Sequence, residues 1–125
     1  MPDGQKFDQG KLRTDLLSVD ALLGTAKVLT HGATKYGDRN WEEGILFHRV
    51  YGAVLRHLLA WWNQEDIDKD SGLPHIDLAA CELMFLQHFV HDYEMYGRFD
   101  DRPQYIVPAE VTTTTEHWHF KSEPS

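Results

Sequence analysis

Apolar residues recur every three or four positions along most of the chain, which is the period of an amphipathic α-helix. The first such stretch begins near Asp15, and Gly32 offers a left-handed stop. The second stretch, from about residue 46 to 64, is the clearest; its apolar stripe comprises Phe47, Val50, Tyr51, Val54, Leu55, Leu58, Trp61 and Trp62. A third stretch starts at Pro74, which suits a first helical turn, and extends to about Tyr96.

These stretches predict an all-α fold in which the second and third helices form an antiparallel hairpin around the acidic loop 65–73. Residues 1–14 are polar and aperiodic, as in an extended arm, and residues 33–37 resemble a short turn. Beyond Gly97 the composition changes to turn formers and then to β-formers, which predicts a short C-terminal β-ribbon or extended tail. We therefore expect a helical domain over residues 1–97 and a tail over residues 98–125.

Composition narrows the classes of function. A chain of 125 residues with 42% hydrophobic residues predicts one folded domain rather than a disordered segment. The net charge of −8 disfavours direct binding to a nucleic-acid polymer, and no apolar run is long enough to predict a membrane span. The chain begins without an apolar leader and contains a lone Cys81, so we expect a cytoplasmic protein.

The most informative feature is a group of ionisable side chains within otherwise apolar helices, between residues 56 and 82. Such groups cost several kcal/mol to bury without partners. The predicted hairpin places Glu82 at the depth of Arg56 and His57, and it places His75 near Glu65. Carboxylates, cations and imidazoles are therefore expected to share one cleft.

Oxygen ligands suit Mg²⁺ or Mn²⁺, and the candidates are Glu65, Asp68, Asp77 and Glu82. Such an ion could activate water for attack at phosphorus, assisted by Lys35, Arg39 or Arg56. Structural roles remain open alternatives: an ion pair between Glu82 and Arg56, a capping role for His75, a core position for His57, and solvated loop positions for Asp66, Asp68 and Asp70.

Five ordered motifs carry a resemblance to a known family. They are Lys11-x-Arg13-x-Asp15, Gly32-Ala-x-Lys35-Tyr36-Gly37-x-x-Asn40-Trp41, Arg56-His57-Leu-x-Ala60-Trp61, Glu65-Asp-x-Asp68 and Ser71-Gly72-Leu-x-His75. Over roughly residues 6–90 the chain resembles phage dATP/dGTP diphosphohydrolases of the all-α MazG-like class. It is especially similar to the cyanophage branch that serves 2-aminoadenine genome synthesis.

This resemblance implies an antiparallel bundle of three to four helices and a metal-dependent hydrolase. The implied reaction converts a purine deoxynucleoside triphosphate, dGTP or dATP, to a monophosphate and pyrophosphate, and dGMP would feed 2-aminoadenine nucleotide synthesis. It also implies Mg²⁺ or Mn²⁺, a homo-oligomer (dimer or tetramer), and location in the host cytoplasm if the chain is phage-encoded.

The chain departs from the family pattern in its metal ligands. MazG-type enzymes typically carry Glu-x-x-Glu on one helix, and the second helix here has no such pair; Leu78 also replaces a histidine found in related sequences. With these departures, the expected metal ligands are Glu65, Asp68, His75, Asp77 and Glu82, and the expected catalytic residues are Glu65, His75 and Glu82.

The substrate-binding residues expected from the resemblance are Lys35, Tyr36, Arg39, Asn40, Trp41, Arg56 and His57. Lys35, Arg39 and Arg56 would meet phosphates, Tyr36 or Trp41 would stack on the purine, and Asn40 would read its edge; a hinge or core role for the aromatic and amide residues stays open. Two other functions remain alternatives: a non-catalytic nucleotide- or protein-binding module, and a triphosphohydrolase that releases tripolyphosphate.

Overall fold

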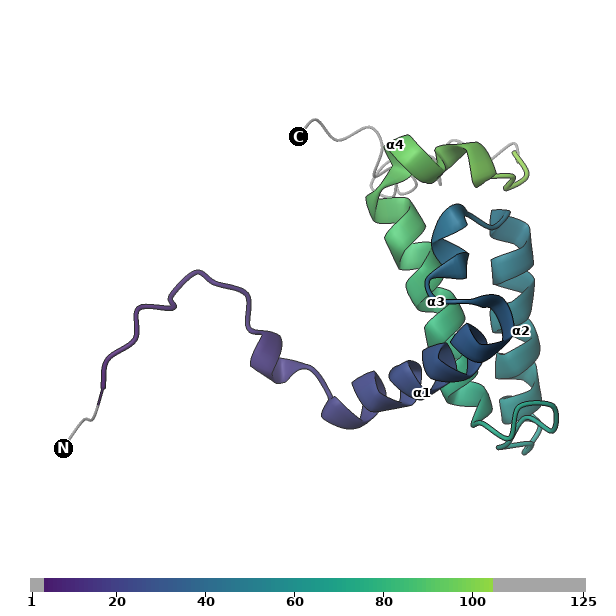
Figure 1. Cartoon of the computed structure of the whole chain (residues 1–125), viewed down its shortest axis with the longest axis horizontal. Coiled ribbons are helices and arrows are strands. Elements are labelled where there is room, and N and C mark those ends of the chain that lie inside the picture. Colours follow the sequence, from purple (N-terminus) through teal and green to yellow (C-terminus); the bar gives the residue numbers. More distant parts are fainter. Residues whose placement is uncertain (1–3, 105–125) are drawn as a thin grey trace, which may run out of the picture.

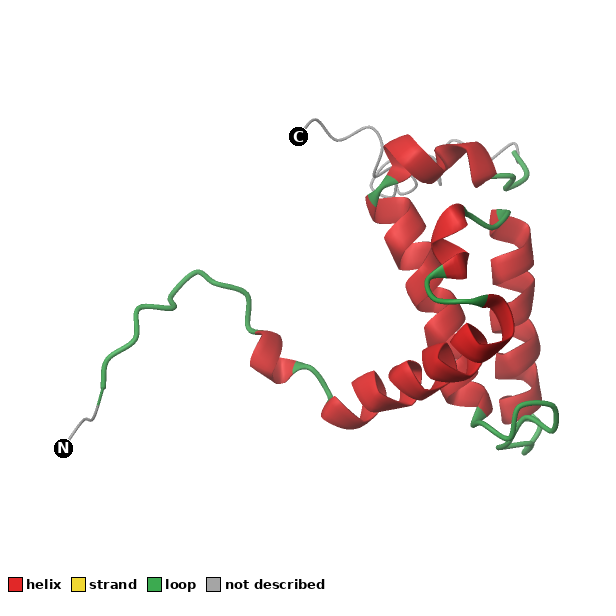
Figure 2. Cartoon of the chain, in the orientation of Figure 1, coloured by secondary structure: helices red, strands yellow, loops and turns green. Residues whose placement is uncertain are grey.

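Four α-helices and three short 3₁₀ turns form the regular structure of residues 4–104, the part of the chain that the computed structural model describes. The α-helices are α1 (Val19–Tyr36), α2 (Phe47–Trp62), α3 (His75–His91) and α4 (Tyr93–Tyr96). The turns are Thr14–Leu16, Asn40–Glu43 and Gly97–Phe99. Figure 2 shows helices and loops without a strand in this part, which confirms the all-α prediction. The predicted C-terminal β-formers lie outside the described residues.

Helices α2 and α3 form the predicted antiparallel hairpin and lie side by side over most of their length (Figure 1). The loop between them is held by backbone hydrogen bonds from His75 N to Asp66 O and from Asp68 N to Leu73 O, each 2.9 Å long. Gly72 adopts a left-handed φ of 75° within this loop. The hairpin therefore has a well-defined closed end, and this end bears the acidic residues.

Helix α1 differs from its predicted bounds at both ends. It begins at Val19, because the Ser18 hydroxyl caps it by accepting a 3.1 Å hydrogen bond from Ala21 N. The prediction that Gly32 ends the helix, with a turn over 33–37, was wrong. A glycine inside a helix costs only about 1 kcal/mol, so α1 continues to Tyr36 and ends at Gly37, whose φ is 94°.

The third predicted helix is divided. Helix α3 ends at His91, and Asp92 has a non-helical φ of −119° before the chain re-enters a helix as α4. The prediction of one helix to Tyr96 was therefore wrong over its last turn. The break lets Tyr96 turn back, so that its hydroxyl donates a 2.6 Å hydrogen bond to the Glu42 carbonyl.

A small aromatic core lies where α2, α3 and α4 meet. Its buried members are Phe47, Val50, Phe89 and Tyr96, and the partly buried residues around it include Trp41, Phe85 and Phe99. The C-terminal half of α1 lies against α3, whereas its N-terminal half and the preceding arm project away from the hairpin (Figure 1). The extended arm predicted for the N-terminus is confirmed for residues 4–13, which have no regular structure and are exposed.

Candidate active site

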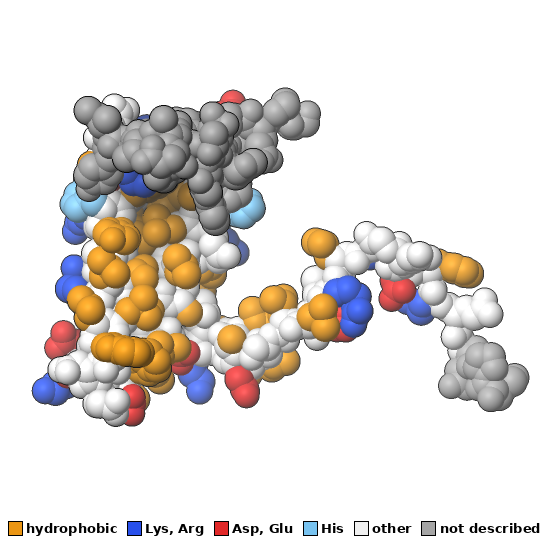
Figure 3. Space-filling view, turned by 180° about the vertical axis from the view of Figure 1, so that it is seen from behind, with side chains coloured by type: hydrophobic (Ala, Val, Ile, Leu, Met, Phe, Trp, Pro, Cys, Tyr) orange, Lys and Arg blue, Asp and Glu red, His pale blue; other side chains and the backbone are white. Residues whose placement is uncertain are grey.

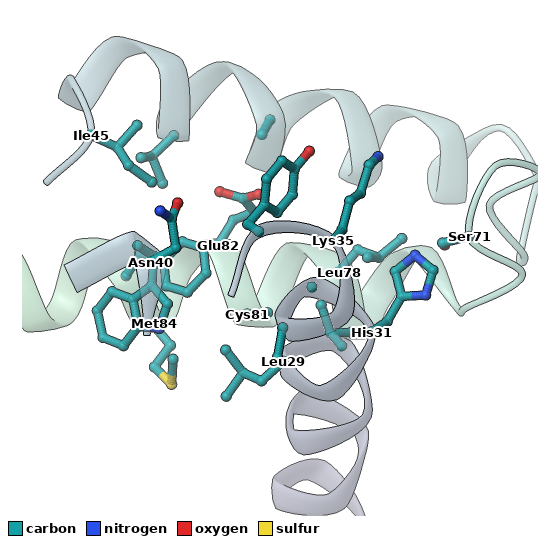
Figure 4. A pocket seen from close by; sticks show the side chains of 18 of the residues that line it. Leu29, His31, Lys35, Asn40, Ile45, Ser71, Leu78, Cys81, Glu82 and Met84 are labelled. Carbon is teal, nitrogen blue, oxygen red and sulfur yellow. The ribbon is translucent and has the colours of Figure 1, made fainter. Parts of the chain in front are cut away.

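A cleft of about 1260 Å³ lies between the C-terminal half of α1, the turn that follows it, and one face of the α2–α3 hairpin. Most of the predicted site residues line it: Lys35, Tyr36, Arg39, Asn40, Trp41, Arg56, His57, Asp68, His75 and Glu82. In Figure 4, Glu82 projects from α3 into the cleft, Asn40 approaches from the turn, and Lys35 reaches across toward α2. Tertiary structure thus gathers residues that are up to 47 positions apart in the sequence (82 − 35).

Glu82 lies half-buried on the α3 wall of the cleft, as the apolar surroundings in the sequence predicted. Burial raises the pKa of the Glu82 carboxyl above its ordinary value, and the Arg56 guanidinium offsets part of this effect. Arg56 and Glu82 do not form an ion pair within 4.0 Å among the contacts of residues 4–104. The Glu82 carboxylate therefore faces the cleft with its negative charge only partly compensated by Arg56. This state favours the binding of a cation or of a hydrogen-bond donor.

Three side chains at the loop end of the hairpin form a continuous hydrogen-bonded chain. His75, which is 4% exposed, places Nε2 2.6 Å from Glu65 Oε2 and Nδ1 2.9 Å from His57 Nδ1. The predicted proximity of His75 and Glu65 is confirmed. Burial lowers the pKa of His57, and the neighbouring His75 lowers it further.

Asp68 has a structural role in the acidic loop. Its Oδ2 accepts hydrogen bonds from Ser71 N at 3.0 Å and from Ser71 Oγ at 2.7 Å. These hydrogen bonds lower the pKa of the Asp68 carboxyl. The loop-capping alternative for Asp68 thus has a defined geometry, although the residue also lines the cleft.

Asp77 points to a different neighbour. Its carboxylate lies directly against Gly24 of α1, where a Cβ atom would come within 2.5 Å of Oδ1. Asp77 is absent from the cleft lining, unlike the candidate ligands His75 and Glu82. The missing side chain at Gly24 allows α1 to approach α3 closely.

The five predicted metal ligands do not form one coordination shell. Within residues 4–104 no three His, Cys, Asp or Glu side chains are grouped closely enough to hold a metal ion. Both ring nitrogens of His75 are already hydrogen-bonded, and Asp77 lies against α1. Mg²⁺, however, commonly uses one or two carboxylates together with waters and substrate phosphates, and Glu82 fits the role of such a carboxylate.

The cations of the cleft come from three elements. Lys35 belongs to α1, Arg39 to the following turn, and Arg49 and Arg56 to α2. Arg39 is largely exposed and forms a 2.6 Å ion pair with Glu42. Lys35, Arg49 and Arg56 are thus the cations available to phosphate groups without giving up an ion pair among the described residues.

The aromatic candidates for base stacking differ in availability. The Trp41 ring stacks on Phe85 with centroids 4.7 Å apart, and it contacts His88 edge-on. Tyr36 is 64% exposed at the mouth of the cleft, with Lys35 Nζ 5.4 Å from its ring centroid. The geometry therefore gives Trp41 a packing role, whereas the Tyr36 ring is largely exposed and carries Lys35 over it.

Several cleft residues were not among those predicted from the sequence, and His31 and Ser71 are two of them. His31 lies one turn before Lys35 on α1, and Ser71 lies in the acidic loop. The i, i+4 spacing of His31 and Lys35 was a usable signal, but it was lost because Gly32 was expected to end the helix. Cys81 also lines the cleft; burial and then Glu82 raise the pKa of its thiol to about 12, which makes it unreactive.

The fold and the cleft define a small helical domain with a mixed acidic and basic site between helices, and sequence comparison places this domain in a family. The chain belongs to the family described as dATP/dGTP diphosphohydrolase, N-terminal, which matches residues 1–102. It is 41% identical over 83 residues to a dATP/dGTP diphosphohydrolase of Salmonella phage PMBT28, a match that covers 66% of this chain and 28% of that protein. The matched region therefore spans just over a quarter of that relative's length.

No solved structure gives a significant match to the chain. Within the described residues, no helix is both long enough and apolar enough to cross a membrane.

Proposed function

We propose that this domain hydrolyses a purine deoxynucleoside triphosphate to the monophosphate and pyrophosphate. The observation that carries the proposal is the position of Glu82, a half-buried carboxylate on the wall of a cleft that also contains Lys35 and Arg56. A carboxylate beside cations can hold a metal-bound triphosphate and stabilise the charge that develops on the leaving group. Family membership supports the same reaction class.

The proposed substrate is dGTP, with dATP as the second candidate. The phage relative is named for both nucleotides. The sequence motifs also resemble those of enzymes that serve 2-aminoadenine genome synthesis. Tyr36 is the proposed stacking surface for the purine, and Asn40 is the proposed contact for its edge. In this role the dGMP product would supply 2-aminoadenine nucleotide synthesis.

Mg²⁺ or Mn²⁺ is the proposed cofactor, with Glu82 as a protein ligand and the substrate phosphates completing the site. When bound, the ion would neutralise phosphate charge and polarise the scissile bond. Lys35 and Arg56 would hold the phosphates from opposite walls, because one belongs to α1 and the other to α2.

The test is incubation of the purified protein with each of the four deoxynucleoside triphosphates, in Mg²⁺, in Mn²⁺ and in EDTA, followed by chromatographic separation of the products. Release of dGMP and pyrophosphate that requires the metal is the expected result. Nucleotide binding without turnover would favour the non-catalytic module, and release of tripolyphosphate would favour the triphosphohydrolase.

We also propose that the chain assembles as a homo-oligomer through the face of the hairpin opposite the cleft. On α2 this face carries Tyr51, Leu55, Leu58 and Trp62, which are 37–77% exposed. These positions recur at helical spacing on the side of α2 opposite Arg49, Ala53 and Arg56. Ile76 and Leu83 continue the exposed apolar surface on α3.

Figure 3 shows hydrophobic side chains gathered over the α2–α3 hairpin on this side. An apolar surface of this extent usually marks an interaction site. A second copy of the chain fits because a two-fold axis would pair the surface with itself. The six named residues carry no charge, so the surface lets two chains of net charge −8 meet without opposing like charges.

A further inference from the structure

When both histidines are neutral, the hydrogen-bonded chain Glu65–His75–His57 has one possible direction. The Glu65 carboxylate can only accept, so the Nε2 atom of His75, 2.6 Å away, must carry the proton. A neutral His75 protonated on Nε2 has an unprotonated Nδ1, which can only accept. His57 Nδ1, 2.9 Å from that atom, must then be the donor.

This direction leaves the second nitrogen of His57 unprotonated. Nε2 of His57 has no hydrogen-bond partner among the contacts of residues 4–104, and no buried side-chain nitrogen or oxygen in this part of the chain lacks a partner. His57 Nε2 must therefore reach solvent. Because His57 lines the cleft, water of the candidate active site is the candidate partner of this atom.

We propose that Glu65 and His75 are positioning residues that hold His57 as its Nδ1–H tautomer, so that the unprotonated Nε2 atom orients the attacking water by accepting its hydrogen bond. This inference deepens the proposed function and rests on it. It assigns to His57 a contact with water in place of the contact with substrate that the sequence suggested. It also gives buried His75 a role that leaves no ring nitrogen for a metal.

The partner of Nε2 follows from donor and acceptor rules. Ionised phosphate oxygens only accept hydrogen bonds, so an unprotonated Nε2 cannot bind them. A hydrolase cleft must hold a water molecule, which can donate to Nε2 while its lone pairs face phosphorus. Arg56 and Lys35 remain as the donors for phosphate on the same cleft.

The first test needs no activity. In the ¹⁵N-labelled full chain at pH 8, long-range ¹H–¹⁵N correlation spectra report which ring nitrogen of each histidine is protonated. The expected result is His57 protonated on Nδ1, and His75 protonated on Nε2. A His57 protonated on Nε2 would overturn the proposal, because Nε2 would then be a donor.

The second test perturbs the chain at its exposed end. Glu65→Gln offers an amide that can donate as well as accept, so the direction of the hydrogen bonds is no longer fixed. The Glu65 side chain is 42% exposed, so we expect the variant to remain folded. We expect mixed His57 tautomers in the spectra and a fall in kcat of about 10- to 100-fold, with KM unchanged. Glu94→Gln, an exposed change on α4, serves as the matched control and should leave both readouts at wild-type values.

The outcomes separate this inference from the proposed function. If the wild-type protein hydrolyses no nucleotide, the proposed function fails while the tautomer is still measurable. If the enzyme is active but Glu65→Gln raises KM at constant kcat, Nε2 contacts the nucleotide and the water assignment is overturned. Loss of kcat without any change in the His57 tautomer would overturn the positioning role of Glu65.

Discussion

Individual residues of the cleft show how burial and hydrogen bonding divide similar side chains into different roles. Glu82 is half-buried and has a raised pKa, whereas Asp68, hydrogen-bonded to Ser71, has a lowered one. A carboxylate already satisfied by its own loop has less to offer a ligand than one that faces a cleft. Substitution of Glu82 and substitution of Asp68 should therefore change the stability of the fold in opposite directions, and each effect should depend on pH.

Glu82→Gln is expected to reduce nucleotide hydrolysis by about 100-fold or more, because it removes the charge proposed to hold the metal-bound substrate.

The same change, Glu82→Gln, should stabilise the fold at neutral pH. The folded-state pKa of Glu82 lies above its ordinary value of 4.5, so its ionisation opposes folding as the pH rises through the folded-state pKa. The variant's gain in unfolding free energy should be near zero below pH 4.5 and grow toward pH 7. Denaturant unfolding at both pH values checks this; a variant less stable than wild type at pH 7 would contradict it.

Asp68→Ala is expected to cost about 1–3 kcal/mol, because the Ser71 amide and hydroxyl lose their acceptor. The pKa of Asp68 is lowered in the folded state, so its stabilisation is present above the ordinary value of 3.8 and is lost as the pH falls through the folded-state pKa. Denaturant unfolding at pH 7 and below pH 3 should therefore show a smaller difference between variant and wild type in acid. Ser18→Ala, which removes a cap remote from this loop, should show no such change.

At the scale of elements, glycines decide how helices and turns meet. Gly24 lets Asp77 of α3 lie against α1, and Gly44 allows Phe99 to pack on the turn before α2. Gly32, in contrast, lies inside α1 with nothing within 4 Å of the position of an added Cβ. The same substitution should therefore have opposite effects at two glycines.

Gly44→Ala is expected to destabilise the fold by about 2–5 kcal/mol. Its φ of 107° is unfavourable for alanine, and the new Cβ would overlap the Phe99 ring. Gly32→Ala should instead stabilise by about 0.5–1 kcal/mol through helix propensity. Thermal unfolding of both variants measures the difference, and equal melting temperatures would contradict this account of the two glycines.

At the scale of the whole molecule, the described part of the chain buries few large side chains and exposes many. Its central core cluster contains four buried residues, whereas apolar residues on the outer face of the hairpin are open to solvent. A small core supplies limited stability. Assembly through the outer face would bury this surface and add stability that the single chain lacks.

Trp62→Glu is expected to weaken the proposed assembly by at least about 30-fold in Kd, because a hot-spot aromatic commonly contributes about 2 kcal/mol or more. The residue is 77% exposed in the single chain, so the fold should be retained. Sedimentation velocity over a range of concentrations checks the assembly, and Met95→Glu, an equivalent change on α4, serves as the control. A wild-type chain that is monomeric at every concentration would refute the proposed oligomer.

The sequence by itself determined the helical class, the extent of α2 and the pairing of α2 with α3, because the apolar period and the acidic turn act locally. It also predicted the half-buried position of Glu82 and the closeness of His75 to Glu65. The sequence did not determine the end of α1, because the free-energy cost of Gly32 within a helix is small compared with the stabilisation from packing of α1 on α3. The break at Asp92 was likewise hidden, since the apolar pattern continues through it.

Only the tertiary structure decided the roles of several chemistry-bearing residues that the sequence could not separate. Asp77 and Glu82 were both candidate metal ligands, but Asp77 lies against Gly24 and Glu82 lines the cleft. Trp41 and Tyr36 looked equivalent as stacking rings, but Phe85 occupies a face of Trp41. The direction of the hydrogen bonds from Glu65 to His57 also depends on distances between α2, its loop and α3. Such contacts join residues far apart in the chain, and local periodicity carries no information about their geometry.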